Sequence, residues 1–188
     1  MIAGRQETCS RVCKARCCQG PSPTLTVFDV ARILRYIQAS PRDLTNYFEI
    51  YTHSEYTENI LPTRTGTRLS RDTLRVLRER LGDLYESLLI IKLRKREDNS
   101  CIFLTEDYRC SIYPVRPLGC RAYPLKVTGV DEECLLVRYG FSLEEEQRYL
   151  KMYLEELFRH YRMLVSNYID SIEKLVRAVE LVWSTISI

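Results

Sequence analysis

Cysteine placement constrains this chain more than any other feature. Seven of its eight cysteines form two groups: Cys9, Cys13, Cys17 and Cys18 near the start, and Cys101, Cys110 and Cys120 later. Pro114, Pro117 and Pro124 restrict the second stretch, because a proline fixes its own φ and disfavours helix at the residue before it. We expect the two groups to meet in one site that binds through sulfur.

The compartment decides what clustered thiols do. The first residues have no apolar run of the secretory type, and no stretch is apolar for long enough to span a bilayer. We therefore expect a cytoplasmic protein without a membrane partner, in which cysteines bind metal rather than form disulfides. A disulfide framework stays open, because 22 arginines to 6 lysines is a thermophile-like composition and hyperthermophile proteins do contain intracellular disulfides.

The ligand set is predicted to be all sulfur. Zinc and iron–sulfur clusters both take thiolates in fours, and His53 and His160 lie far from any cysteine in the sequence. Zinc sites commonly pair ligands as C-x2-C, which the chain lacks. The spacing C-x3-C-x3-CC followed by C-x8-C-x9-C favours an iron–sulfur cluster of the 4Fe-4S type, with zinc as the alternative.

Individual cysteines have different expected roles. Cys9, Cys13 and Cys17 would share one face of a helix, because they are spaced by four residues. Cys17 and Cys18 are adjacent and cannot easily bind one metal together, so one ligates while the other packs, binds a second centre or reacts. Cys134 stands alone before an apolar run, and we expect it to pack as a small buried residue.

The predicted fold is α+β and mostly helical. Residues 1–140 form a cysteine-cluster domain, with an amphipathic helix after Thr26, a short helix over Leu44–Tyr51, a loop over residues 52–69 and a helix from Ser70. The apolar residues Leu89, Ile91 and Leu93 alternate with Lys92, Arg94 and Arg96, as in a half-buried strand. Asp98-Asn99 is a turn signal and Cys101–Leu104 can return as the paired strand, which predicts a β-hairpin around residues 88–104.

Residues 141–188 form the second predicted unit. Apolar residues recur there in steps of three and four, which predicts one long helix or a pair broken near Ser166-Asn167. The apolar stripe packs on the protein's own core or forms a helix–helix interface such as a homodimer.

A stripe of basic residues is a candidate nucleic-acid-binding surface. It comprises Arg68, Arg71, Arg75, Arg78, Lys92, Arg94, Lys95 and Arg96. We interpret it as a solvated face, because no aromatic stacking platform interleaves the charges.

Longer motifs surround the cysteines. They are Cys9, Cys13, Cys17-Cys18, Asp29, Cys101–Leu104, Cys110–Tyr113, Arg116-Pro117 and Cys120–Pro124. Together they resemble the YkgJ-type cysteine-cluster family, described as a zinc- or iron-chelating domain. The usual opening of that family is C-x2-C-x2-CC, and the longer C-x3-C-x3-CC of this chain is similar to the branch that contains flagellin lysine N-methylases.

This resemblance implies metal binding through the seven clustered cysteines, with iron–sulfur as the favoured occupant. Arg116, Arg121 and Asp29 are candidates to support the cluster, the arginines by donating hydrogen bonds to its sulfurs or by holding the Asp29 carboxylate. The methylase branch adds an S-adenosylmethionine-dependent lysine methyltransferase as an alternative. However, the chain has no Gly-rich strand-to-helix turn followed by an acid, and we assign no catalytic residue.

Overall fold

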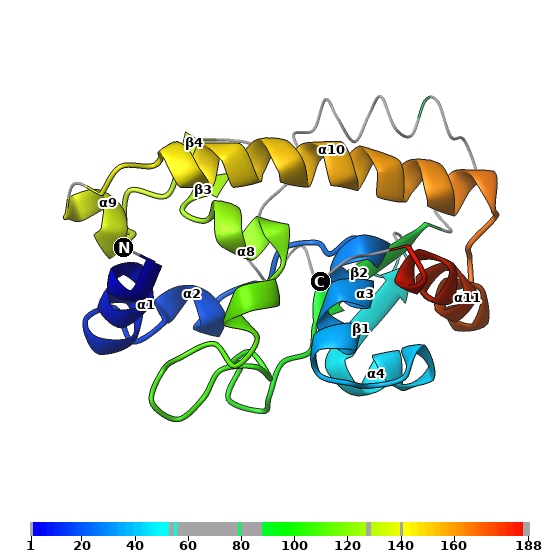
Figure 1. The fold of residues 1–188 in the computed structure, drawn as a ribbon, viewed down its shortest axis with the longest axis horizontal. Coiled ribbons are helices and arrows are strands. Elements are labelled where there is room, and N and C mark those ends of the chain that lie inside the picture. Colours follow the sequence, from blue (N-terminus) through cyan, green and yellow to red (C-terminus); the bar gives the residue numbers. More distant parts are fainter. Residues whose placement is uncertain are drawn as a thin grey trace.

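The computed structural model describes residues 2–52, 55, 79, 88–126, 129–139 and 141–185. It is α+β and mostly helical, as predicted, with one long helix in its C-terminal part and two small antiparallel strand pairs (Figure 1). The helices are α1 (Ile2–Arg11), α2 (Arg16–Gln19), α3 (Val27–Tyr36), α4 (Leu44–Tyr47), α8 (Leu118–Ala122), α9 (Leu135–Arg138), α10 (Glu144–Ser166) and α11 (Ile172–Trp183), with 3-10 turns η1 (Pro41–Asp43) and η4 (Tyr113–Val115). The strands are β1 (Phe48–Thr52), β2 (Leu89–Leu93), β3 (Leu125–Lys126) and β4 (Gly129–Val130).

Two of the predicted elements fall mostly on residues that the structure does not describe. The predicted loop over 52–69, beyond Thr52 and Glu55, and the predicted helix from Ser70, except Glu79, lie outside the described residues.

Strand β2 is confirmed, but its predicted partner is wrong. β2 pairs with β1 in antiparallel register, Phe48 opposite Leu93 and Thr52 opposite Leu89. The turn at Asp98-Asn99 forms, yet Cys101 makes only an isolated bridge to Lys95. The reason is that both edges of β2 are occupied, by β1 on one side and by an isolated bridge to Leu25 on the other.

The short helix predicted over Leu44–Tyr51 is half right. It ends at Tyr47, and the following residues FEIYT form β1. Aromatic and β-branched side chains favour an extended backbone that packs on a sheet, and this preference prevails over the helical spacing.

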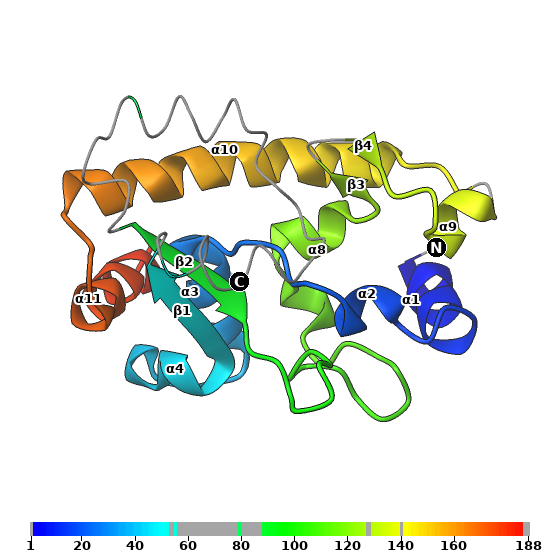
Figure 2. The same cartoon turned by 180° about the vertical axis from the view of Figure 1, so that it is seen from behind.

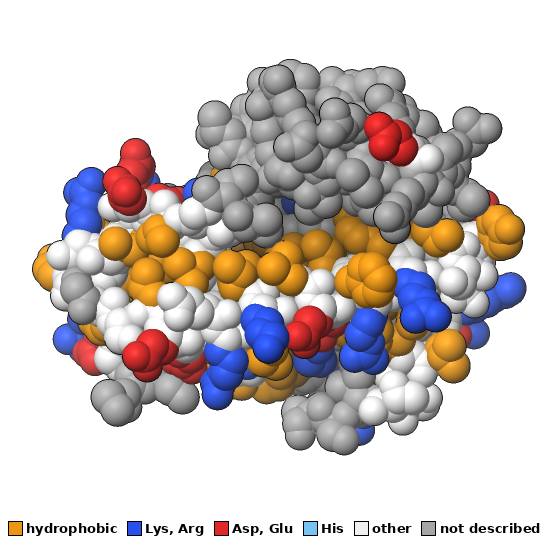
Figure 3. Space-filling view, turned by 90° about the horizontal axis from the view of Figure 1, so that it is seen from above, with side chains coloured by type: hydrophobic (Ala, Val, Ile, Leu, Met, Phe, Trp, Pro, Cys, Tyr) orange, Lys and Arg blue, Asp and Glu red, His pale blue; other side chains and the backbone are white. Residues whose placement is uncertain are grey.

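The C-terminal segment is a helical pair with its break where predicted, at Asn167. The two helices do not pack mainly on each other: α10 lies on α8, and α11 lies on α3 (Figures 1 and 2). Leu164, Leu175 and Val179 of the apolar stripe are buried in the shared core. On the outer face of α10, Leu154 and Phe158 are exposed, and Figure 3 shows apolar side chains in a row along this face. A homodimer through this face stays a prediction.

Within the described part of the chain, no helix combines the length and the apolar character needed to cross a membrane.

One buried carboxylate joins three helices. Asp29 lies at the third position of α3, where its side chain accepts from the Thr26 N–H while the Thr26 hydroxyl accepts from the Asp29 N–H, a capping box. The second carboxylate oxygen accepts from the Leu118 N–H at 3.1 Å and from Arg32 at 2.6 Å. Arg32 also donates to Glu156 of α10 at 2.7 Å. Asp29 therefore holds α3, the start of α8 and α10 together.

We expect Asp29→Ala to lower the free energy of unfolding by about 3–5 kcal/mol, because it leaves buried donors and part of a buried ion pair without a partner. Urea denaturation followed by circular dichroism measures the change. Asp43→Ala is the matched control, since Asp43 is exposed and makes no side-chain cap, and should shift the free energy by no more than about 0.5 kcal/mol. Equal effects of the two substitutions would contradict the proposed role of Asp29.

His160 makes stability depend on pH. Its imidazole is fully buried, its Nδ1 accepts from the Val27 N–H at 3.2 Å, and burial lowers its pKa to about 3. The unfolded imidazole titrates near its ordinary pKa, so below that pH the unfolded state binds a proton that the folded state rejects. Stability from neutral His160 is thus fully present above pH ~6.5 and is lost as pH falls towards 3.

Between pH 6.5 and 5 we expect the unfolding free energy of the wild type to fall by up to about 1.4 kcal/mol per pH unit on account of His160. His160→Gln should flatten this slope, since the amide can still accept from Val27 but does not titrate. Urea unfolding across this pH range tests the prediction, and an unchanged slope in the variant would refute it.

Candidate metal centre

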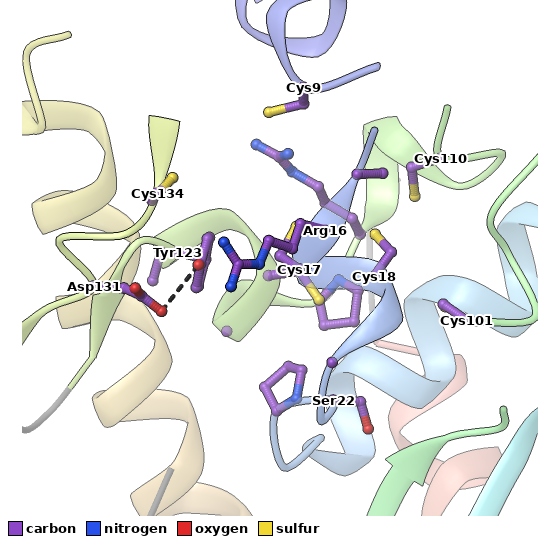
Figure 4. Close-up of a pocket in the computed structure, with 18 of the residues that line it drawn as sticks. Cys9, Arg16, Cys17, Cys18, Ser22, Cys101, Cys110, Tyr123, Asp131 and Cys134 are labelled. Atoms are coloured by element: carbon purple, nitrogen blue, oxygen red, sulfur yellow. Dashed lines mark hydrogen bonds between the residues drawn. The ribbon is translucent and has the colours of Figure 1, made fainter. Parts of the chain in front are cut away.

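All eight cysteines line one cavity of about 570 Å³ (Figure 4). The seven clustered cysteines of the sequence are joined there by Cys134, which the sequence left as a packing residue. Cys134 is indeed buried, but it borders the cavity. The two groups, some ninety residues apart in the chain, therefore face a common space.

The first group is not on one helical face, contrary to the prediction. Helix α1 ends at Arg11, and Lys14 and Ala15 adopt left-handed φ values of 52° and 49° before α2 begins. Ala15 is 4% exposed within the core, and its N–H donates to the Cys9 carbonyl at 2.8 Å. Burial and this hydrogen bond offset a left-handed conformation that costs about 1–2 kcal/mol per residue. The corner separates Cys9 and Cys13 from Cys17 and Cys18.

Backbone contacts tie Cys18 to the second group. The Cys18 carbonyl accepts from the Cys101 N–H at 2.8 Å and from Lys95 Nζ at 2.9 Å. The Cys101 carbonyl accepts from the Leu104 N–H at 2.9 Å, and Leu104 forms a bridge with Cys110. Cys18, Cys101 and Cys110 are therefore fixed relative to one another by main-chain hydrogen bonds.

Cys120 reaches the cavity from α8. The preceding residue must be glycine, because a Cβ at Gly119 would lie 2.7 Å from Pro23 Cβ and 3.5 Å from the Tyr153 ring. This close packing, with the bond from the Leu118 N–H to Asp29, holds α8 between the N-terminal segment and α10.

The thiols differ in acidity. Burial is the first cause that raises the pKa of Cys9 to about 11 and of Cys110 to about 12. Cys18 is the exception: a hydrogen bond from the Cys17 thiol, aided by the charges of Lys95 and Arg116, lowers its pKa to about 7. The same hydrogen bond raises the pKa of Cys17, so Cys17 is the donor and Cys18 the thiolate acceptor of the pair.

The three predicted supporting residues have different positions. Arg116 lines the cavity and stacks 4.2 Å above the Tyr113 ring. Burial raises the pKa of Cys120, and the charge of Arg116 opposes that rise in small part. Arg121 instead donates to the Arg116 and Pro114 carbonyls, which braces the turn η4. Asp29 is paired with Arg32 rather than with either predicted arginine, because α3 places Arg32 one turn away from it.

The predicted solvated basic face also needs correction. Lys92 is 6% exposed, and its Nζ donates to the Ser22 carbonyl and the Thr24 hydroxyl, both at 3.1 Å. Lys95 points to Cys18 and lines the cavity. Both lysines therefore donate hydrogen bonds to the segment that begins with Cys18. The only sequence signal for this was that Lys92 lies among apolar residues of the strand. The arginines at 68–78 lie outside the described residues.

Sequence reasoning missed one polar group at the cavity wall. The Tyr123 hydroxyl donates to Asp131 at 3.0 Å (Figure 4). Lys126 Nζ pairs with the same carboxylate at 2.8 Å. Both Tyr123 and Asp131 line the cavity beside Cys134. The spacing Asp131 to Cys134 carries no recognised motif, so no sequence signal marked them.

The donor set fits a thiophilic metal, although no coordination shell is preformed. In the described part of the chain, no three Cys, His, Asp or Glu side chains are grouped as metal ligands. Free thiols do not attract one another, and a metal supplies the energy that gathers them. Lys95 and Arg116 would offset the negative charge of the resulting thiolates. His160 bonds to the α3 backbone, so nitrogen ligation from it is not indicated.

In reduced, metal-free protein, we expect Cys18 to react fastest with iodoacetamide near pH 7, because thiolates are the nucleophilic form. Lys95→Met should slow this reaction by removing a nearby positive charge. Lys126→Met is the matched control, since Lys126 lines the same cavity but pairs with Asp131. Peptide mass spectrometry gives the rates, and preferential labelling of Cys9 or Cys110 would be the contrary result.

No curated protein and no solved structure shows a significant match to this chain. A family model does match: CxxCxxCC, described as a "putative zinc- or iron-chelating domain", aligns with residues 8–137, which contain all eight cysteines. This match does not support the predicted resemblance to the flagellin methylase branch. That prediction relied on the first cysteines, whose C-x3-C-x3-CC spacing differs from the C-x2-C-x2-CC of the family name. Because the matched range is more than half of the chain, the protein belongs to this family of cysteine-rich zinc- or iron-chelating domains.

Proposed function

We propose that the protein binds an iron–sulfur cluster through the cysteines of this cavity. The observation that carries the proposal is that every cysteine of the chain borders the same 570 Å³ space, in a family defined by zinc or iron chelation. Buried thiols scattered through a core would have no reason to share one cavity.

The shape of the site supports iron–sulfur over zinc. Zinc holds four sulfurs at about 2.3 Å, so the thiols of a structural zinc site surround a single ion and leave no space between them. Here the thiols line a wide cavity and leave room for a bulkier group. The absence of any C-x2-C pair in the sequence agrees with this. A zinc-stabilised interaction domain is the alternative that the same donors allow.

The chain's own residues would perform three tasks. The cysteines hold the group, Lys95 and Arg116 provide positive charge beside the sulfurs, and the apolar lining, which includes Phe103 and Leu157, limits the access of water. A bound iron–sulfur cluster supplies one-electron redox chemistry. The residues at the wall suit binding and electron storage, because sulfur and cationic side chains line it. An S-adenosylmethionine-dependent methyltransferase is the enzymatic alternative.

Anaerobic purification followed by iron, zinc and acid-labile sulfide analysis tests the proposal. We expect iron and sulfide in equal amounts, with the broad visible absorption of a thiolate-ligated cluster. Cys110→Ser should lower both contents, because it removes one donor. Iron-free protein that binds stoichiometric zinc would replace the proposal with the structural alternative, and protein that binds neither metal would refute metal binding.

A further inference from the structure

One side of the cavity is formed by α10 and carries no sulfur, because this helix contains no cysteine. Its lining residues, which we call the α10 face, are Leu150, Tyr153, Leu157 and Tyr161. They follow one another at steps of three or four positions and therefore share one face of the helix. The Tyr153 hydroxyl donates to the Thr24 carbonyl at 2.8 Å, which holds its ring against the segment before α3. A metal bound by thiols makes no use of this face.

The cavity has the size and the lining of a small-molecule site. Its volume of about 570 Å³ falls within the range of about 300–1,000 Å³ that is usual for such sites. Apart from the cysteines, most of the side chains that line it are apolar or aromatic. Sites of this kind hold the apolar body of an organic ligand and orient it with a few polar groups. The orienting group is to be sought among the charged residues of the lining.

Most of these charged residues already have partners. Arg16 pairs with Glu133 at 2.9 Å, and Lys126 pairs with Asp131 at 2.8 Å. The Lys95 ammonium donates to a backbone carbonyl at 2.9 Å. Each of these cations is therefore engaged by an oxygen of the protein itself.

Arg116 differs from the other cations of the cavity. It is half-buried, and its guanidinium carbon lies 4.2 Å from the centroid of the Tyr113 ring. Within the described part of the chain, its side chain makes no hydrogen bond and no ion pair. A guanidinium is a rigid plane with five N–H donors at its edge, and stacking on a ring uses only its face. The donors of Arg116 are thus left to bind an anion in the cavity.

A carboxylate matches this donor set. It accepts two parallel hydrogen bonds from one guanidinium and balances its single charge. A phosphate dianion would require a second cation, and Arg16, Lys95 and Lys126 are already engaged. An apolar or aromatic body on the same molecule suits the α10 face.

We propose that the cavity binds, beside its metal centre, a small organic carboxylate whose anionic group pairs with Arg116 and whose apolar body packs on the α10 face. This site goes beyond the proposed function, because sulfur does not hold the ligand. Arg116 can serve the metal centre and the carboxylate together, since its five donors exceed the two that a carboxylate accepts.

Calorimetric titration of the anaerobically purified protein with 2-naphthoate and with its neutral isostere 2-naphthamide tests the proposal. We expect 2-naphthoate to bind at one site per chain, and 2-naphthamide to bind at least about tenfold more weakly because it forms no charged pair. Arg116→Met should weaken 2-naphthoate binding by at least about tenfold and leave 2-naphthamide binding unchanged. Arg138→Met is the matched control, since Arg138 lines the same cavity but is exposed, and should change the affinity by less than about threefold.

A second matched pair tests the α10 face. Leu150→Ala removes apolar surface from this face and should weaken both probes by at least about threefold. Leu154→Ala, one turn further along α10 on its exposed side, should leave both affinities unchanged. Circular dichroism confirms that the variants fold, and titrations are compared at equal iron content, so that loss of metal is not mistaken for loss of the carboxylate site.

Three results would overturn the carboxylate site. They are equal affinities of the wild type for 2-naphthoate and 2-naphthamide, unchanged 2-naphthoate binding in folded Arg116→Met, and tighter binding of inorganic phosphate than of 2-naphthoate. Iron-containing wild type that binds neither naphthalene probe would also refute this site while leaving the proposed function intact. Metal-free wild type that still binds 2-naphthoate through Arg116 would refute the proposed function and support the carboxylate site.

Discussion

The buried carboxylate of Asp29 is the interaction on which the arrangement of the site depends. A charge taken out of water must find compensating donors, and Asp29 finds them in its own helix cap, in Arg32 and in the N–H of Leu118, 89 residues further along the chain. Arg32 extends the same network to Glu156 of α10. Because Cys120 lies two residues after Leu118, the position of a cavity thiol is set by a carboxylate that contacts no sulfur. Asp29 thus supports the site, but by a different route from the one the sequence suggested.

The two walls of the cavity are built differently. Around Cys18, Cys101 and Cys110, main-chain bonds and the Lys95 ammonium fix the backbone directly. Around Cys9 and Cys134, short helices meet and are held by ion pairs between side chains. Exposed ion pairs such as Arg16–Glu133 contribute little stability. The first wall is therefore held mainly by main-chain hydrogen bonds, and the second by contacts between side chains, of which the Arg5–Glu146 pair is the more buried.

Proton affinity connects this architecture to metal binding. Most cavity thiols are protonated at neutral pH, because burial raises their pKa values, and a metal must displace those protons to bind. Cys18 is already poised as a thiolate by Cys17, Lys95 and Arg116. The adjacent cysteines at positions 17 and 18 thus combine the most acidic thiol with a strongly protonated one.

Local patterns determined much of this protein from the sequence. The amphipathic helix after Thr26, the strand Leu89–Leu93 and the break at Asn167 each follow from periodicity, capping or polarity within a few residues. The cysteine spacing identified seven of the eight thiols that border the cavity. Tertiary structure decided what depends on distant partners: β1 rather than Cys101–Leu104 pairs with β2, Lys92 is buried, and Arg32 binds Asp29. Cys134 joined the cavity for the same reason, since the packing of α1 on α9 brings it there, and no pattern within its own segment records that contact.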